Sequence, residues 1–143
     1  MNDIVVGIDR SDTAHRAAET AAELAMAFGA NLHLVMCVER GPSANFKVGS
    51  EQFHTDWLTE AEQFLEAAAT DLQAPSVTRT VAVGDPAVML CEEAERLQAH
   101  TIVVGNRRVQ GLSRVLGSVA ADVTKRAPCH VLIAQTKTGF AAE

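Results

Sequence analysis

The sequence contains no tyrosine, and aromatic residues make up only 4% of it, so a buried core has to be built from aliphatic side chains. No apolar run approaches the roughly 18–20 residues that a membrane-spanning helix needs, so we expect no membrane span. Basic residues are fewer than acidic ones, 12 against 18, and the net charge of −6 argues against binding to duplex nucleic acid. The opening stretch MNDIVVGIDR lacks the basic start and the cleavage site of a secretory leader, which favours a cytoplasmic protein.

Cysteine is also scarce. Cys37, Cys91 and Cys129 lie far apart in apolar runs, with no C-x-x-C pair and no histidine at zinc spacing. We therefore expect free cysteines that pack as small hydrophobic side chains rather than a metal or redox site. His33 and His130 each have apolar neighbours, and we expect both to pack on strand faces rather than to bind a ligand.

Patterns typical of buried strands and of amphipathic helices alternate along the chain. Short β-branched apolar runs predict strands, and apolar residues at three- and four-residue spacing predict helices. Gly29 is expected to end the first helix, and Asp85 followed by Pro86 to start the third. Residues 39–50 hold Gly, Pro, Ser and Asn and predict a mobile loop. The expected strands are 4–8, 32–38, 77–83, 101–104 and 131–134; the expected helices are 14–28, 53–72, 86–97 and a last one beginning at 117–118 with Lys125 and Arg126 in its final turn.

This order predicts an α/β fold. Right-handed crossovers that contain helices give three layers, an open five-stranded parallel sheet with helices on both faces, as in Rossmann-like proteins. The alternation of polar and apolar residues in 77–83 places that strand at a sheet edge, half exposed. No repeat or linker divides the chain, so we expect a single domain over residues 1–143, with 136–143 as a frayed tail.

Ligands of such sheets bind beyond the carboxyl ends of the strands, which here selects the loops after the first and fourth strands, around Asp9 and Gly105. The second loop is unusual in its charge. Between Gly105 and residue 126 the basic residues are Arg107, Arg108, Arg114, Lys125 and Arg126, and the acid is Asp122 alone.

Gly117 and Ser118 follow this loop, at the expected start of the last helix. The free N–H groups of a helix N-terminus form a natural anion site. Gly117 lets a ligand approach the backbone closely, and the Ser118 hydroxyl can donate to a phosphate oxygen. A solvated basic loop followed by a capping serine fits the same residues equally well, so the sequence leaves both interpretations open.

Asp9 would repel a phosphate, so its carboxylate is better suited to accept hydrogen bonds from an adenine amino group or a ribose hydroxyl. Ser11 either assists Asp9 or simply caps the following helix. Val38, at the end of the second strand, either walls a flat base or packs in the core. The chain has no G-x-x-x-x-G-K-[ST] and no G-x-G-x-x-G, which argues against a phosphate-binding P-loop and against dinucleotide binding.

Three segments together resemble the universal stress protein family: IVVGIDRSDTAHRAAETAAELA, VGDPAVMLCEEAERLQAHTIVVGNRR and LGSVAADVTKRAPCHVLIAQT. The resemblance covers nearly the whole chain in order. It implies the strand order 3-2-1-4-5, and a homodimer formed through the last strand, at Val131, Leu132, Ile133 and Ala134.

Many members of that family bind ATP or another adenine nucleotide through a glycine signature, G-x2-G-x9-G-[ST]. The resemblance therefore implies a stress-response protein that binds ATP, AMP or cyclic AMP, with Mg²⁺ as a bridge between phosphate oxygens. It implies at most slow ATP hydrolysis, and no catalytic residue is assigned. Asn106 and Arg107 fall within the phosphate loop, and the implied binding residues are Asp9, Ser11, Val38, Val104, Gly105, Arg107, Arg108, Gly117, Ser118 and Val119.

Two features depart from the family signature. Arg108 replaces its second glycine, and eight residues rather than nine separate Arg108 from Gly117. A guanidinium there can bind phosphate in a paired geometry, or it can obstruct the site. The alternative function is a homodimeric interaction module of the same fold that works without a nucleotide. A hydrolase or transferase is a third and weaker hypothesis.

Overall fold

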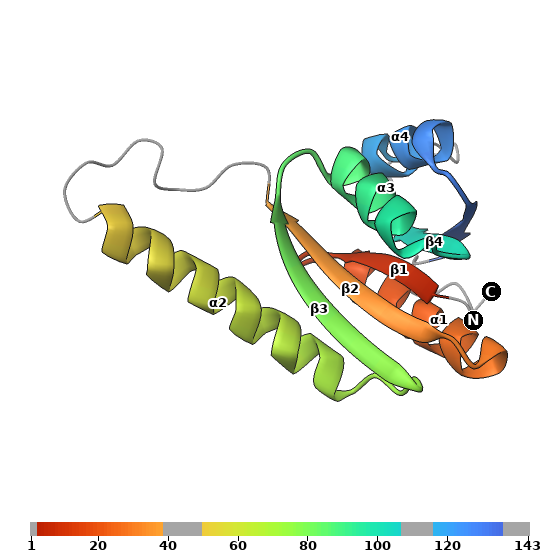
Figure 1. Ribbon diagram of the computed structural model, residues 1–143, viewed down its shortest axis with the longest axis horizontal. Helices are drawn as coiled ribbons and strands as arrows, with labels where there is room; N and C mark the ends of the chain where they lie inside the picture. The colour runs from red at the N-terminus through yellow and green to blue at the C-terminus, as the bar shows by residue number, and fades with distance from the viewer. Residues whose placement is uncertain (1–2, 39–49, 107–115, 136–143) are drawn as a thin grey trace.

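A computed structural model describes residues 3–38, 50–106 and 116–135, with no side-chain description for 50–56. Its elements alternate regularly between strand and helix (Figure 1). The strands all run parallel, in the order β3-β2-β1-β4-β5, which confirms the predicted three-layer α/β fold and the strand order that the resemblance implies. The elements are β1 (Asp3–Ile8), α1 (Asp12–Phe28), β2 (Asn31–Val38), α2 (Ser50–Thr70), β3 (Ser76–Val83), α3 (Pro86–Leu97), β4 (Thr101–Gly105), α4 (Ser118–Arg126) and β5 (His130–Ala134).

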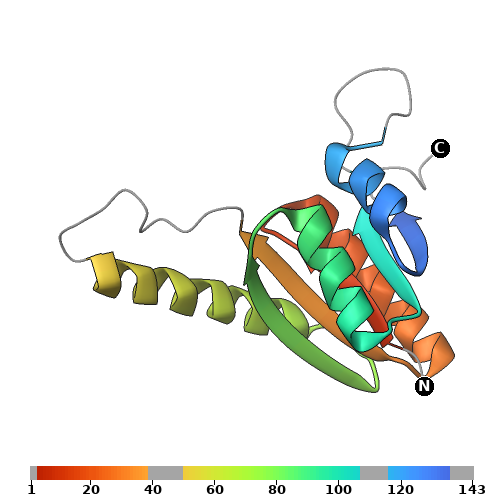
Figure 2. The same cartoon turned by 45° about the horizontal axis from the view of Figure 1, so that its top comes forward.

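The helices cover the two faces of the sheet in pairs. One core cluster joins residues of α1 and α2 to one face, and a second joins residues of α3 and α4 to the other. Figure 1 shows α3 and α4 in front of the sheet and α1 behind it, and Figure 2 keeps that arrangement after rotation. α2 runs alongside β3 and extends past the edge of the sheet in both views.

The core is aliphatic, as the composition predicts. Ile4, Val5 and Val6 of β1 have no exposed surface, because β1 lies between two strands and between two layers of helices. α1 faces the sheet with alanines, including Ala17 and Ala21, whose small side chains let the helix approach β1 closely. The described helices all lack the length or the continuous apolar stretch that a bilayer span requires.

The helix ends follow the local chemistry that the sequence predicts. Ser11 caps α1 by accepting a hydrogen bond from the Ala14 N–H at 3.1 Å, and Gly29 ends the helix in the left-handed conformation, with φ +67°. Asp85 caps α3 by accepting from the Val88 N–H at 3.2 Å, directly before the proline at the first helical position.

α2 begins earlier than predicted. It starts at Ser50, which the sequence analysis placed in the loop 39–50, and it ends at Thr70, before the predicted end near residue 72. Residues 50–52 contribute no apolar residue to the helical stripe, so periodicity does not detect the first turn. The rest of that loop, 39–49, and the predicted tail, 136–143, lie outside the described residues.

β3 is an edge strand, as predicted, with Ser76, Thr78, Arg79 and Val83 exposed. Its end is joined to β2 through the turn that leads into α3. The Gly84 N–H donates to the Val38 carbonyl at 2.8 Å. Gly84 has φ +151°, a conformation that L side chains rarely adopt, and a Cβ atom there would lie 3.1 Å from the sulfur of Met89. This turn therefore requires glycine.

Gly84→Ala is expected to lower the free energy of unfolding by about 2 kcal/mol or more, because backbone strain and the contact with Met89 act together. Gly29→Ala is the matched control, since φ is also positive there but a Cβ atom would meet nothing within 4 Å. We expect it to cost only about 1 kcal/mol. Urea unfolding followed by circular dichroism measures both variants, and equal losses would contradict the assignment.

Candidate functional site

A cavity of about 470 Å³ opens at the carboxyl ends of β1 and β4. It lies between the N-termini of α1 and α4, at the point where the strand order reverses, the usual ligand site of open parallel sheets. Its volume falls within the roughly 300–1,000 Å³ of small-molecule sites. The lining residues are Gly7, Ile8, Asp9, Ser11, Thr13, Ala14, Val35, Cys37, Pro86, Leu90, Val104, Gly105, Leu116, Gly117, Ser118, Val119 and Ala120.

The fold brings most of the predicted site residues to this one cavity. Val38 is an exception, because the preceding residue, Cys37, lines the cavity instead. Arg107 and Arg108 lie outside the described residues, as do Gly111 and Arg114 of the same basic stretch. The predicted residues that line the cavity are Asp9, Ser11, Val104, Gly105, Gly117, Ser118 and Val119.

The turn between β1 and α1 fixes the direction of the Asp9 carboxylate. Oδ1 of Asp9 accepts hydrogen bonds from both the Ser11 N–H, at 2.8 Å, and the Ser11 hydroxyl. The same Ser11 oxygen caps α1, so capping and assistance to Asp9, the two predicted roles of Ser11, are combined in one side chain. Asp9 itself is exposed at the cavity wall.

Arg10 continues the turn and places its guanidinium 4.6 Å from the centre of the Phe64 ring on α2.

The opposite wall is the N-terminus of α4. Gly117 occupies the capping position, with φ −65° and ψ 163°, and makes no side-chain cap. Ser118 is therefore the first helical residue and not the cap, which corrects the alternative of a capping serine. The Gly117 N–H donates to Oδ1 of Asn106 at 2.9 Å, and the Gly117 carbonyl accepts the first helical hydrogen bond, from Ala121.

The floor of the cavity is apolar, and sequence reasoning did not identify its residues. Leu90 of α3, only 2% exposed, reaches β1 at Gly7, where an added Cβ atom would lie 3.1 Å from a Leu90 methyl group. A glycine inside a buried strand was the available signal, because it often marks such a close approach. Val35 and Pro86 complete this apolar side.

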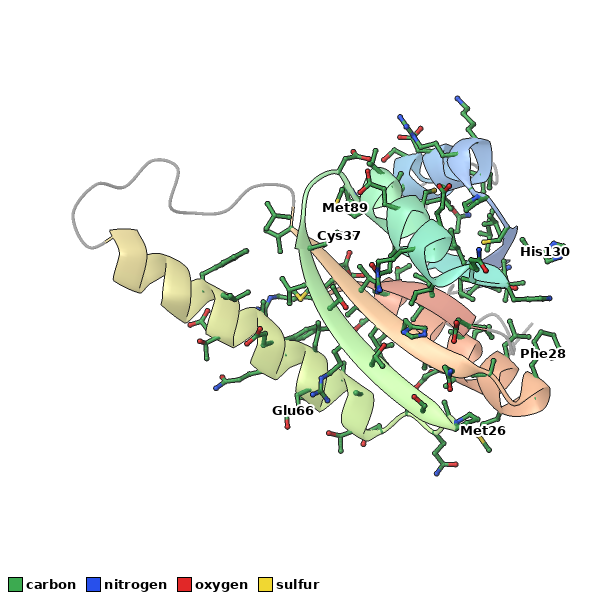
Figure 3. All side chains as sticks on the ribbon, viewed as in Figure 1. Met26, Phe28, Cys37, Glu66, Met89 and His130 are labelled. Carbon is green, nitrogen blue, oxygen red and sulfur yellow. The ribbon has the colours of Figure 1, made fainter. Side chains whose placement is uncertain are left out.

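Cys37 contributes a neutral thiol to the apolar wall. Burial, with a smaller contribution from the negative charge of Asp85, raises the pKa of the Cys37 thiol from 9.0 to about 12. Its sulfur donates a weak hydrogen bond to the Pro86 carbonyl at 3.9 Å. Figure 3 shows Cys37 and Met89 together beside the first turns of α3, and Phe28 and His130 at the far end of the molecule. All three cysteines are free, as predicted, and burial is the main cause that raises the pKa of Cys91 and of Cys129.

His33 and His130 do not line the cavity. His33 contacts Thr78 across the strands and approaches Asp3 at 3.2 Å, so it packs on a strand face as predicted. His130 is exposed, and its ring centre lies 5.0 Å from that of His100. Among the side chains that the structure describes, those of residues 3–38, 57–106 and 116–135, no three His, Cys, Asp or Glu are grouped to hold a metal ion.

The sheet order and the cavity define an open α/β protein with a cavity of small-molecule size at its topological switch point. The chain belongs to the universal stress protein family, whose sequence model matches residues 1–135. It is 32% identical over 142 residues to a universal stress protein of Mycobacterium tuberculosis. The matched region covers 93% of this chain and 95% of that protein.

Two solved structures of the family resemble this one and hold adenine nucleotides. A universal stress protein in complex with cAMP is 31% identical, with a TM-score of 0.64 over 95% of this chain and 98% of that one. The universal stress protein from Archaeoglobus fulgidus in complex with dAMP is 26% identical, with a TM-score of 0.62 over 93% of this chain and 97% of that one.

Iodoacetamide is expected to alkylate Cys37 slowly in the folded protein. With its pKa at about 12, only ~0.1% of this thiol is ionised at pH 9, and the thiolate is the reactive form. In guanidinium-unfolded protein a thiol with a pKa of 9.0 is about half ionised at that pH, so we expect the folded-state rate to be roughly 500-fold lower, measured by mass spectrometry of the Cys37 peptide.

Asp85→Asn keeps a capping side chain but removes the charge, so the pKa of Cys37 falls and alkylation should be faster at a given pH. The rate in the unchanged protein should keep rising from pH 9 toward pH 12. A folded-state rate equal to the unfolded one would contradict the burial of this thiol.

Proposed function

We propose that the protein binds an adenine nucleotide in the cavity between β1, β4 and α4. The observation that carries this proposal is the pairing of an acidic wall at Asp9 with the N-terminus of α4, across an apolar floor. The cAMP and dAMP complexes of two family members support the same ligand class. A role in stress response or signalling fits a protein with a binding site and no assigned catalytic residue.

The two walls suit different parts of a nucleotide. The carboxylate of Asp9, oriented by Ser11, would accept hydrogen bonds from a ribose hydroxyl or the adenine amino group. The apolar side formed by Val35, Cys37 and Leu90 would contact the flat base. Placing the phosphates near Asp9 would set like charges against each other, so they belong at the other wall.

The phosphate side would be the first turn of α4. Gly117 precedes the helix, Ser118 and Val119 are exposed in its first turn, and their backbone N–H groups lie at the positive end of the helix dipole. Arg107 and Arg108 of the basic loop would add positive charge to the same phosphates. ATP is included in the proposal with AMP and cyclic AMP, and Mg²⁺ would bridge phosphate oxygens rather than bind to a protein site. Hydrolysis, where it occurs, would be slow.

Ser118→Ala is expected to weaken AMP about tenfold in isothermal titration calorimetry, because a hydrogen bond to a charged oxygen is lost. Adenosine, which has no phosphate, should bind this variant as it binds the unchanged protein. Ser76→Ala, an exposed serine at the opposite end of the sheet, is the matched control and should alter neither affinity.

Thermal unfolding provides the broader test. A ligand at 100 times its dissociation constant stabilises a folded protein by about 2.7 kcal/mol. Flat calorimetric traces and an unchanged melting temperature with millimolar ATP, AMP and cyclic AMP would overturn the proposal and leave the interaction module as the better function.

We further propose that two copies associate through β5. This strand is at the edge of the sheet, and its middle residues, Val131, Leu132 and Ile133, are apolar and only half-buried. An apolar edge strand has unpaired backbone groups that a second copy can satisfy. The opposite edge, β3, exposes mostly polar residues, Ser76, Thr78 and Arg79, with Val83 at its end as the exposed apolar one.

Val131→Lys should convert a dimer into a monomer in sedimentation velocity, because a charged side chain on an edge strand opposes strand pairing. Ser76→Lys, on the other edge, should leave the dimer intact. Circular dichroism confirms that both variants fold, and a folded Val131→Lys protein that stays dimeric would place the interface elsewhere.

A further inference from the structure

Asn106 bonds to the end of the helix to which we assign the phosphates. It follows β4 directly, and its Oδ1 accepts a hydrogen bond from the Gly117 N–H at 2.9 Å. The bond joins the last residue before the segment 107–115 to the capping residue just beyond it. Asn106 and Gly117 are both half-buried.

The Gly117 N–H is one of the N–H groups that a helix cannot satisfy by itself. The first helical hydrogen bond, from Ala121 to the Gly117 carbonyl, leaves the N–H groups of Gly117, Ser118, Val119 and Ala120 without an intrahelical acceptor. Gly117 has no side chain with which to cap the helix. Asn106, eleven residues earlier in the chain, supplies an acceptor from outside the helix.

An amide oxygen and a phosphate oxygen compete for the same donor. Both accept along the N–H direction, but the phosphate is charged, and hydrogen bonds to a charged acceptor are shorter and roughly twice as strong as neutral ones. A phosphate that uses the Gly117 N–H must therefore displace the Asn106 oxygen. A ligand without phosphate leaves the Asn106–Gly117 bond in place.

We propose that Asn106 is a specificity-determining residue that occupies the place of a phosphate oxygen until a phosphate-bearing ligand displaces it. The inference rests on the proposed nucleotide function and adds to it a residue that sets the affinity for the phosphate group alone. Because this hydrogen bond must break first, Asn106 lowers the affinity for a phosphate-bearing ligand by the strength of one hydrogen bond. In the ligand-free protein, the Asn106 oxygen keeps weaker acceptors from bonding to the Gly117 N–H.

Isothermal titration with AMP and with adenosine tests this role. Asn106→Ala removes the competing oxygen, so AMP should bind about fivefold more tightly, the factor that one ordinary hydrogen bond contributes. Adenosine should bind unchanged. Asn106→Asp keeps the acceptor and adds a negative charge beside the phosphate, so AMP should weaken about tenfold or more while adenosine again stays unchanged.

Asn31→Ala is the matched control. The Asn31 side chain also makes a hydrogen bond that bridges distant segments, to Asp3 at 3.0 Å, but it lies at the start of β2, away from the cavity. It should bind both ligands like the unchanged protein. Melting temperatures of all variants confirm that each is folded at the titration temperature.

The outcomes separate this inference from the proposed function. If the unchanged protein binds AMP but Asn106→Ala binds it equally or more weakly, Asn106 supports the phosphate site instead of competing for it, and the inference is overturned alone. An equal change for AMP and adenosine would also overturn it, since the effect would not depend on phosphate. If the unchanged protein binds neither ligand, the proposed function and the inference both fail.

Discussion

The central strand β1 is buried on both faces, and yet the residue directly after it, Asp9, carries a charge at the protein surface. Ile4, Val5 and Val6 have no exposed surface, and β1 pairs with β2 on one side and β4 on the other. Alanines on the inner face of α1 make the close packing possible. The first position where the chain can carry a charge beyond this strand is Asp9, and that position is a wall of the cavity.

The same constraint explains why the site is built largely from backbone and short side chains. β1 and β4 pair as parallel neighbours, so Asp9, directly after β1, and Gly105, the last residue of β4, line a common cavity. Long side chains enter this space from α3, where Leu90 fills the floor below Gly7. The polar functions come from the ends of α1 and α4, whose positions depend on how those helices pack on the sheet.

The fold could be predicted from the sequence almost completely, because each buried strand is an aliphatic run and both α1 and α3 begin at a capping residue. The early start of α2 at Ser50 was missed, since its first turn has no residue in the apolar stripe. The strand order came from the family resemblance, as periodicity does not reveal which strands are neighbours. The structure confirms that order.

The candidate site was only half predictable. Asp9 and Gly105 follow from the rule that ligands bind beyond the carboxyl ends of parallel strands, and Gly117 follows from the anion-binding N–H groups at the start of a helix. Cys37 and Leu90 do not, because they reach the cavity through packing between elements distant in sequence. Val38 and Cys37 show the limit of strand patterns: neighbouring residues point to opposite faces, and a shift of one position changes which of them meets the cavity.

The two edges of the sheet differ in a way that limits growth of any assembly. β5 presents apolar, half-buried residues, whereas β3 presents Thr78 and Arg79 to the solvent. If two chains join edge to edge through β5, the continuous sheet that results terminates at a polar β3 strand on both outer sides. Polar and charged edge strands resist further strand addition. Such pairing would therefore stop at two copies, and the polar β3 edges would protect the dimer against growth into fibres.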